Sequence, residues 1–285
     1  MRCVPWFFAV GVCVVLGGCS SLELRSAASG APAAHRLPAK PFLFVTNFQL
    51  QESDPIVLNL LGLREEVHDT LQLPLSEVQI EIYIFDDRPS FQRFMADHYP
   101  DLPPRRAFFI AQAEREVVYS FRGDRLDEDL RHETCHALVH AVIPDLPLWL
   151  DEGIAEYFES PTDAAGIHAQ HLAELRSAIQ EGWHPSLTRL ETITQVGQMT
   201  RGDYRDAWGW VHFLLHSSPQ RRGELLNYLA DLRAGAVNEP FSSRLFRTVP
   251  QADTALVRHL VQLGESRSQG MNLSRAGTIG REPER

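Results

Sequence analysis

The chain has 285 residues, of which 44% are hydrophobic and 22% are charged, as in an ordinary folded protein. Its length allows one large domain or two small ones, with enough apolar residues for a sizeable core. The formal net charge is -10 and no run of lysine and arginine interrupts it, which argues against a nucleic-acid-binding surface.

The chain begins with a segment typical of protein export. Arg2 gives a short positive start, and the apolar run Val4–Leu16 behind it is too short to span a bilayer as a stable helix. The run ends in Leu16-Gly17-Gly18-Cys19, and small residues before a cysteine resemble the bacterial lipobox. The resemblance implies cleavage before Cys19, lipidation of Cys19 and, because Ser20 follows, sorting to the outer membrane of a Gram-negative cell. We therefore predict a lipoprotein signal peptide over residues 1–18, with an ordinary secretory signal or a short membrane anchor as alternatives.

Cysteine usage agrees with this prediction. Cys3 and Cys13 would leave with the signal peptide and Cys19 would carry lipid, so that only Cys135 remains. One cysteine excludes an intramolecular disulfide framework and a structural zinc site built from several cysteines. For Cys135 we expect a small buried core residue, with a redox or inhibitory role as the alternative.

Two further segments lack any hydrophobic period. Residues 19–41 are rich in Ala, Ser, Gly and Pro, which is typical of a flexible tether. About 22 such residues have a typical end-to-end distance of roughly 25 Å, so a lipid-anchored domain could work close to the membrane without touching it. Residues 265–285 are polar, and we predict a disordered tail there. The folded domain is therefore expected over residues 42–264.

Residues 42–121 combine strand and helix patterns. A strand, a helix and a strand at the start of this part favour a small mixed sheet. Two later strands are joined by a short polar turn, as in a hairpin. The strands predicted here are Phe42–Phe48, Val78–Phe85, Ala107–Gln112 and Glu116–Phe121, and the helices are Pro55–Leu71 and Pro89–His98.

Residues 122–264 show a helical period almost throughout. We therefore predict an α+β fold, in which a small N-terminal mixed sheet precedes a mainly helical region. The helices predicted in this region are Leu126–Val142, Pro147–Phe158, Ile167–Glu181, Asp203–His216, Gln220–Ala234 and Ala252–Leu263.

The first of these helices carries a pattern that suits a metal ion. His132 and His136 lie four residues apart, so both imidazoles project from one helix face. Two neutral imidazoles suit zinc and leave positions for a third ligand and a water molecule. Glu133 flanks the same face, where it could take a proton from that water. The alternative interpretation is an amphipathic helix with two half-buried histidines.

A third ligand is available on the next helix. Glu152 lies sixteen residues after His136, inside the sequence Leu148-Trp149-Leu150-Asp151-Glu152-Gly153-Ile154-Ala155-Glu156-Tyr157-Phe158-Glu159. Pro144 and Pro147 break the chain between the two helices, so the second helix can fold back on the first and bring Glu152 to the metal. HExxH followed by a helix of this type resembles the gluzincin zinc metallopeptidases of the aminopeptidase N and thermolysin superfamily, and most of all a peptidase-MA-like branch. The resemblance implies a zincin-like fold over about residues 42–232.

The resemblance also assigns roles. It implies that His132, His136 and Glu152 bind Zn²⁺ and that Glu133 is the general base and later the proton donor. It implies that Glu156, one helical turn after Glu152, hydrogen-bonds a histidine ligand; an exposed helix carboxylate is the alternative.

Hydrolysis of this kind needs a donor to the oxyanion of the tetrahedral intermediate. The resemblance implies a tyrosine or histidine on a helix after the metal site, and Tyr204 is the candidate. A half-buried tyrosine with no catalytic role is the alternative, and His212 on the same helix is a rival donor. The resemblance further implies that the strand before the metal helix offers its edge to an extended substrate.

The remaining histidines suggest no further ligand. His140 continues the four-residue spacing but would lie a full turn beyond the metal, so we expect a helix-surface or supporting histidine. His168 and His171 lack a partner motif and are expected on a solvated face.

The sequence therefore predicts a zinc metallopeptidase in the bacterial cell envelope, held by a lipid anchor in the outer membrane and facing the periplasm. The interval between His136 and Glu152 is shorter than in aminopeptidase N relatives, and their GxMEN motif is absent, so an endopeptidase acting on peptides or proteins is expected. One alternative is a catalytically inactive zinc-binding scaffold lipoprotein, although a scaffold has no need of Glu133. Another is hydrolysis of a different envelope amide, such as a peptidoglycan cross-link. The sequence favours no particular oligomeric state.

Overall fold

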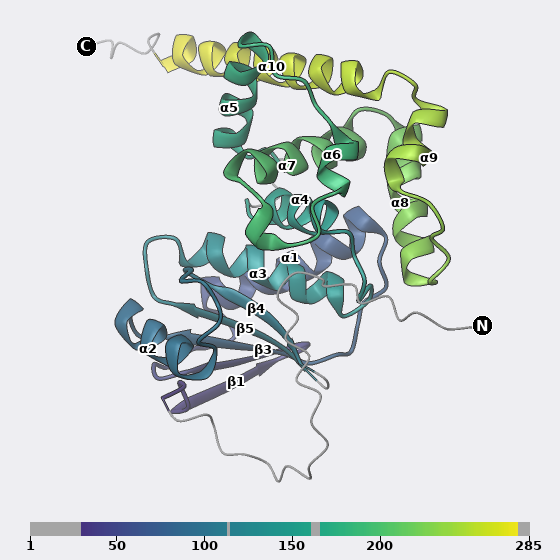
Figure 1. Cartoon of the computed structure of the whole chain (residues 1–285). Coiled ribbons are helices and arrows are strands. Elements are labelled where there is room, and N and C mark those ends of the chain that lie inside the picture. Colours follow the sequence, from purple (N-terminus) through teal and green to yellow (C-terminus); the bar gives the residue numbers. More distant parts are fainter. Residues whose placement is uncertain (1–29, 113–114, 161–165, 279–285) are drawn as a thin grey trace, which may run out of the picture.

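The computed structural model describes residues 30–112, 115–160 and 166–278, with side chains up to residue 265. A mixed sheet forms one end of the molecule, and the helices of the second half stack on one face of the sheet and beyond it (Figure 1). The predicted α+β fold is therefore confirmed. The proposed signal peptide and Cys19 lie outside the described residues.

The sheet has five strands in the order β1-β2-β3-β5-β4. The inner pairs β2–β3 and β3–β5 are parallel, and the outer pairs β1–β2 and β4–β5 are antiparallel. The parallel pairs require crossovers, which contain α1 (Pro55–Leu71) and α2 (Arg88–His98). The strands are β1 His35–Ala39, β2 Phe42–Thr46, β3 Ile80–Phe85, β4 Phe108–Gln112 and β5 Arg115–Phe121.

The central strand β3 is buried along its whole length because helices cover both faces of the sheet. Ile80, Ile82 and Ile84 belong to the large core under α1 and under α3 (Leu126–His140). Tyr83 and Phe85 point the other way, into a smaller aromatic core that α2 completes. The period of two along β3 thus separates the two cores.

Strand β1 corrects the predicted tether. Residues 35–39 were assigned to the tether, yet they pair antiparallel with β2, with Leu37 opposite Phe44 and Pro38 opposite Leu43. The strand is mostly exposed and contains a proline, which is tolerated at a sheet edge. Leu37 and Ala39 pack partly against the large core, but two apolar positions in a strand of five residues are too few to show a period in the sequence.

The helical region follows the prediction with additions. The short helices α6 and α9 and the 3-10 turn η2 were not predicted, because they are too short to show a period. Helix α10 continues to Thr278, beyond the predicted end at Leu263 and into the predicted disordered tail; no proline interrupts residues 251–278. The helices are α3 Leu126–His140, α4 Leu148–Phe158, α5 Ala169–Gln180, α6 Leu187–Glu191, α7 Arg201–His216, α8 Pro219–Arg233, α9 Phe241–Thr248 and α10 Ala252–Thr278, with η2 at Val196–Gln198.

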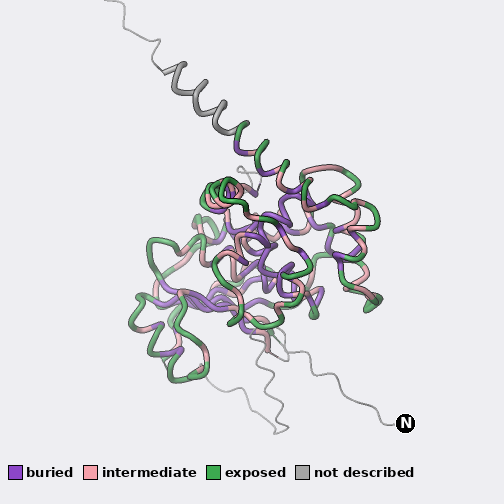
Figure 2. Tube along the Cα trace, turned by 45° about the horizontal axis from the view of Figure 1, so that its top comes forward, coloured by how far each residue is buried: buried purple, intermediate pink, exposed green. Residues whose placement is uncertain are grey.

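Helix α4 lies at the centre of this region, packed against α3 on one side and α7 on the other. The tryptophans Trp149, Trp208 and Trp210 are completely enclosed there. Figure 2 shows the same distribution, with buried residues gathered in the sheet and the helices stacked on it and exposed residues at the outer turns. Among the described residues, no helix is both long enough and apolar enough to span a membrane.

Candidate metal centre

Helices α3 and α4 meet because the chain turns sharply between them. Helix α3 ends at His140, and α4 begins at Leu148 directly after Pro147. Ile143 and Leu146 in the turn are buried, so apolar packing as well as proline fixes the reversal. The predicted return of the second helix onto the first is confirmed.

The turn brings the three predicted ligands together. The Nε2 atoms of His132 and His136 are 3.2 Å apart, and Oε2 of Glu152 lies 3.5 Å from the first and 3.6 Å from the second. Zinc bonds of about 2.0–2.2 Å in a tetrahedron place neighbouring ligand atoms roughly 3.4 Å apart. The three atoms therefore form one face of a tetrahedron of the size that zinc requires.

The hydrogen-bond partners of the two imidazoles lie at Nδ1, which leaves the two neighbouring Nε2 atoms for a metal. Nδ1 of His136 lies 2.7 Å from Asp151, and Nδ1 of His132 lies 3.3 Å from Glu159. Since a carboxylate only accepts, each Nδ1 carries a hydrogen, and in the neutral imidazole the lone pair is then on Nε2, where a metal could take it. Carboxylates in this position orient the imidazole and raise its basicity toward a metal.

His140 is a further partner of Asp151. Its Nε2 lies 3.0 Å from the second oxygen of Asp151, and its Nδ1 lies 3.2 Å from the carbonyl oxygen of Pro144. Both nitrogens face acceptors, so both carry hydrogen, and the charge of Asp151 raises the pKa of His140 against the opposing effect of burial. His140 is thus buried and supports Asp151. Of the two predicted alternatives, a helix-surface histidine and a supporting histidine, the structure favours the second.

The electrostatics of the centre favour positive charge. Burial alone would lower the pKa of His136, but Asp151 and Glu152 raise it to about 10. Burial alone would raise the pKa of Glu152, but the two imidazoles lower it to about 2. Burial also opposes charge on His132, whose pKa is raised by Glu152 and Glu159, so the carboxylates around the two histidines stabilise a cation at this place.

The predicted base lies beside the ligands. Oε2 of Glu133 accepts a hydrogen bond of 2.7 Å from the backbone N–H of Phe109, which fixes the carboxylate and leaves its other oxygen out of this contact. Phe109 belongs to β4, which lies at the edge of the sheet as the hairpin prediction required. An open pocket of about 510 Å³ borders the centre, lined by Pro103, Arg105, Phe108, Phe109, Glu133, His136, His140, Leu148, Asp151, Glu152 and Val196.

Tyr204 also belongs to this neighbourhood. Burial and the charge of Glu152 raise the pKa of Tyr204, while the charge of Arg105 opposes them. The rival donor, His212, lies in the core and pairs with His259 of α10 at 2.9 Å. The alternative assignment to His212 is therefore wrong, because a residue two turns farther along α7 faces α10 and not the metal pocket.

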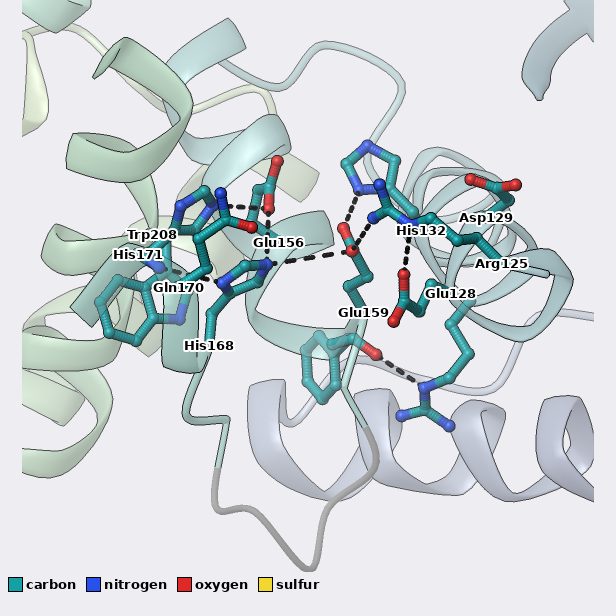
Figure 3. Close-up of polar contacts among 12 residues, drawn as sticks. Arg125, Glu128, Asp129, His132, Glu156, Glu159, His168, Gln170, His171 and Trp208 are labelled. Atoms are coloured by element: carbon teal, nitrogen blue, oxygen red, sulfur yellow. Dashed lines mark hydrogen bonds and ion pairs between the residues drawn. The ribbon is translucent and has the colours of Figure 1, made fainter. Parts of the chain in front are cut away.

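Glu156 does not take the role predicted for it. Its carboxylate hydrogen-bonds His171 at 2.8 Å, and Glu159 makes the contact with His132 instead (Figure 3). Helix spacing places both carboxylates near the face of Glu152, and the lean of α4 across α3 decides which of them reaches His132. The prediction for Glu156 was wrong by one turn.

His168 and His171 are not solvated, which corrects a second prediction. His171 is buried, their rings stack with centroids 3.8 Å apart, and both Nε2 atoms face Glu156 (Figure 3). Although ligand-type atoms of all three lie within 4.8 Å, Nδ1 of His168 accepts the backbone N–H of His171 as the cap of α5. Each Nε2 must then carry the hydrogen, so neither offers a lone pair to a metal.

Two residues of the centre had no predicted role. Asp151 directly precedes Glu152, and Glu159 follows it by seven residues, which is two helical turns. Both spacings place the carboxylates near the side of α4 that carries Glu152, and Glu156 has a compatible spacing as well. Which of these carboxylates reaches a histidine depends on how α4 packs on α3, and the sequence pattern does not predict that packing.

Arg131, next to the first ligand, was also missed. Its side chain is buried and donates to Glu66 and Asn59 of α1, both at 2.6 Å, and to the carbonyl oxygen of Phe158 at 2.8 Å. It thereby ties α3 to α1 and to the end of α4. Cys135 on the same helix is buried and free, which confirms it as a small core residue, and burial raises the pKa of its thiol.

Residues 129–241 match a protein family described as "Protein of unknown function (DUF1570)". The matched segment runs from the first turn of α3 to the start of α9, so it contains His132, His136, Glu152 and Tyr204. No curated protein matches the chain.

Proposed function

We propose that this protein is a zinc-dependent hydrolase, and specifically a metallo-endopeptidase of the gluzincin type. The observation that carries the proposal is the geometry of the centre: three ligand atoms separated by 3.2–3.6 Å, with both imidazoles in the tautomer that a metal needs. Glu133 beside this centre supports a hydrolase over a purely structural zinc site. Zinc fits the donor set, because two imidazoles and one carboxylate leave the fourth position for water, as in catalytic zinc sites.

The residues around the centre would divide the chemistry. Zinc, when bound, would polarise the scissile carbonyl and acidify the attacking water. The oxygen of Glu133 that Phe109 leaves unused would take the proton of the water and later deliver it to the departing nitrogen. Tyr204, whose raised pKa keeps it a hydroxyl, would donate to the developing oxyanion.

The decisive experiment separates the base from the ligands. Glu133→Gln preserves size and keeps an acceptor for the Phe109 N–H but removes the basic carboxylate. We expect zinc content and thermal stability to stay near the wild-type values while turnover of a broad peptide set falls by about 10²–10⁴-fold. Metal analysis and peptide cleavage on the purified protein measure both quantities.

Glu156→Gln is the matched control, because it makes the same chemical change on a carboxylate that contacts His171 and not the metal face. It should retain full turnover. A fully active Glu133→Gln protein would falsify the mechanism. A folded, zinc-loaded wild type that cleaves neither peptides nor peptidoglycan would favour the inactive scaffold.

We also propose that the protein is anchored in the cell envelope, on the strength of Leu16-Gly17-Gly18-Cys19. Cys19→Ala removes the acceptor for lipid and should shift the protein from the membrane fraction to the soluble fraction. Fractionation of cells that express each form tests this, and unchanged membrane partition would exclude lipid anchoring at Cys19.

A further inference from the structure

Three pockets meet at one side chain next to the metal centre. The metal pocket of about 510 Å³ shares Arg105 and Phe108 with an open pocket of about 710 Å³ that Met95 and Leu102 help to line. On the other side of Glu133 lies an open pocket of about 600 Å³, and Arg105 lines that one as well. A substrate that extends from the metal centre into any of these pockets would therefore lie beside Arg105.

Arg105 differs from the other arginines of this groove. Arg106 is held by Asp129 at 2.9 Å and by a second aspartate at 3.0 Å, and Arg125 is held by Glu128 and Glu159. Arg105 is exposed and makes no ion pair with any carboxylate in the described ranges 30–112, 115–160 and 166–278. The charge of Arg105 acts on Tyr204, but the hydroxyl of Tyr204 is neutral and leaves the guanidinium charge uncompensated.

The charges around Arg105 indicate which kind of substrate group it could bind. Three acidic side chains, Glu133, Asp151 and Glu152, line the metal pocket, the other arginines of the groove are paired with carboxylates, and the whole chain carries a net charge of -10. Such a groove repels an anionic substrate unless a cation is placed to receive it. A guanidinium is the side chain best suited to a carboxylate, since its parallel N–H groups bind both oxygens.

We propose that Arg105 binds a carboxylate of the substrate, so that the enzyme selects peptides with an acidic group beside the scissile bond. The inference rests on the proposed function and adds a substrate class to it. The carboxylate has two sources, an Asp or Glu side chain or the C-terminal carboxylate of the peptide. Since Arg105 lines two pockets together with Glu133 and its charge acts on Tyr204, a carboxylate bound to it lies close to the reacting carbonyl.

The test compares matched peptides on the zinc-loaded full chain. One arm pairs Glu with Gln at each position around the scissile bond, and the other pairs a free C-terminal acid with its amide. We expect the acidic member of one arm to have a kcat/KM about tenfold above its neutral partner. Arg105→Gln should abolish this ratio, Arg105→Lys should keep part of it, and Arg105→Glu should turn the preference toward Lys.

Arg233→Gln is the control, because it removes the same charge from an exposed arginine at the end of α8 that lines none of the three pockets. It should leave the ratio unchanged. Equal cleavage of both members by the wild type, or a preference that survives Arg105→Gln, overturns the inference. The arm that shows the preference identifies the source of the carboxylate.

Equilibrium binding keeps the inference independent of turnover. The same peptide pairs are titrated calorimetrically into zinc-loaded Glu133→Gln protein, with and without Arg105→Gln. Tighter binding of the acidic member, lost with Arg105, supports the inference even if the wild type cleaves nothing, in which case the proposed function alone fails. Binding without any dependence on the carboxylate, or no binding at all, overturns it.

Discussion

Asp151 is the residue on which the histidines of the centre depend most directly. One of its oxygens fixes Nδ1 of His136 at 2.7 Å and the other accepts from His140 at 3.0 Å. An asparagine at this position keeps the first contact through its oxygen but turns an NH₂ group toward Nε2–H of His140. It also removes the charge that makes His136 a stronger ligand.

Asp151→Asn should therefore weaken zinc binding by about 10–100-fold, and Glu159→Gln should act in the same direction through His132. Competition with a chromophoric chelator measures the affinity. Glu156→Gln serves as the control and should bind zinc as the wild type does, since its hydrogen bond goes to His171. Equal zinc affinity in the wild type and the three variants would mean that the contacts of Asp151 and Glu159 with the histidines do not strengthen zinc binding.

The sequence predicted which candidate ligands lie together better than it predicted the residues that support them. The four-residue spacing of the histidines and the proline-broken turn before Glu152 are local facts, and local facts follow from the sequence. The choice between Glu156 and Glu159 depends on the angle at which α4 crosses α3, which many distant side chains set. Arg131 illustrates the same limit, since its partners lie on α1, 65 and 72 residues away along the chain.

At the scale of the elements, the close approach of α4 and α7 decides where Tyr204 lies. A methyl group at Gly153 of α4 would meet the backbone oxygen of Ala207 at 2.7 Å and the side chain of Val211 at 2.8 Å. Glycine is therefore required here for contact between helices, because a backbone atom cannot move aside as a side-chain tip can. Gly153 follows Glu152 directly, so this contact also seats the third ligand.

Gly153→Ala should destabilise the protein by about 1–3 kcal/mol through overpacking and should lower turnover by displacing Tyr204. Gly223→Ala on α8 is the matched control. A methyl group there meets nothing within 4 Å, so only helix propensity acts, and the change should stabilise by about 0.5–1 kcal/mol. Denaturant unfolding measures both, and equal effects of the two substitutions would exclude the packing role.

The elements themselves were largely predictable, because most are long enough to show a period. Helix α1 begins and ends at the predicted residues, and β3 loses only two residues from its predicted start. Strand β1 was not predictable in this way, since it places only Leu37 and Ala39 against the core and is too short to show a period. Helices α6 and α9 likewise have too few turns for a pattern.

At the scale of the whole molecule, a metal ion at the proposed centre would cross-link two helices. His132 and His136 come from α3, and Glu152 comes from α4, which packs on α7 in the core of the helical region. The unfolded chain does not hold these three groups together, so a metal ion would bind the folded state in preference. Metal affinity is therefore also folding free energy.

Removing the metal should lower the melting temperature substantially. Free zinc at 1,000 times its Kd stabilises a folded protein by about 4 kcal/mol. Since 1 kcal/mol shifts the Tm of a domain of 150–250 residues by about 2–4 °C, chelation should lower Tm by about 8–16 °C. Glu133→Gln should show the same shift because Glu133 is not a ligand. His136→Ala and Glu152→Ala should show almost none, since each removes a ligand from the tetrahedral face. Differential scanning calorimetry with zinc and with chelator makes the comparison, and a full zinc-dependent shift in the two alanine variants would place the metal elsewhere in the molecule.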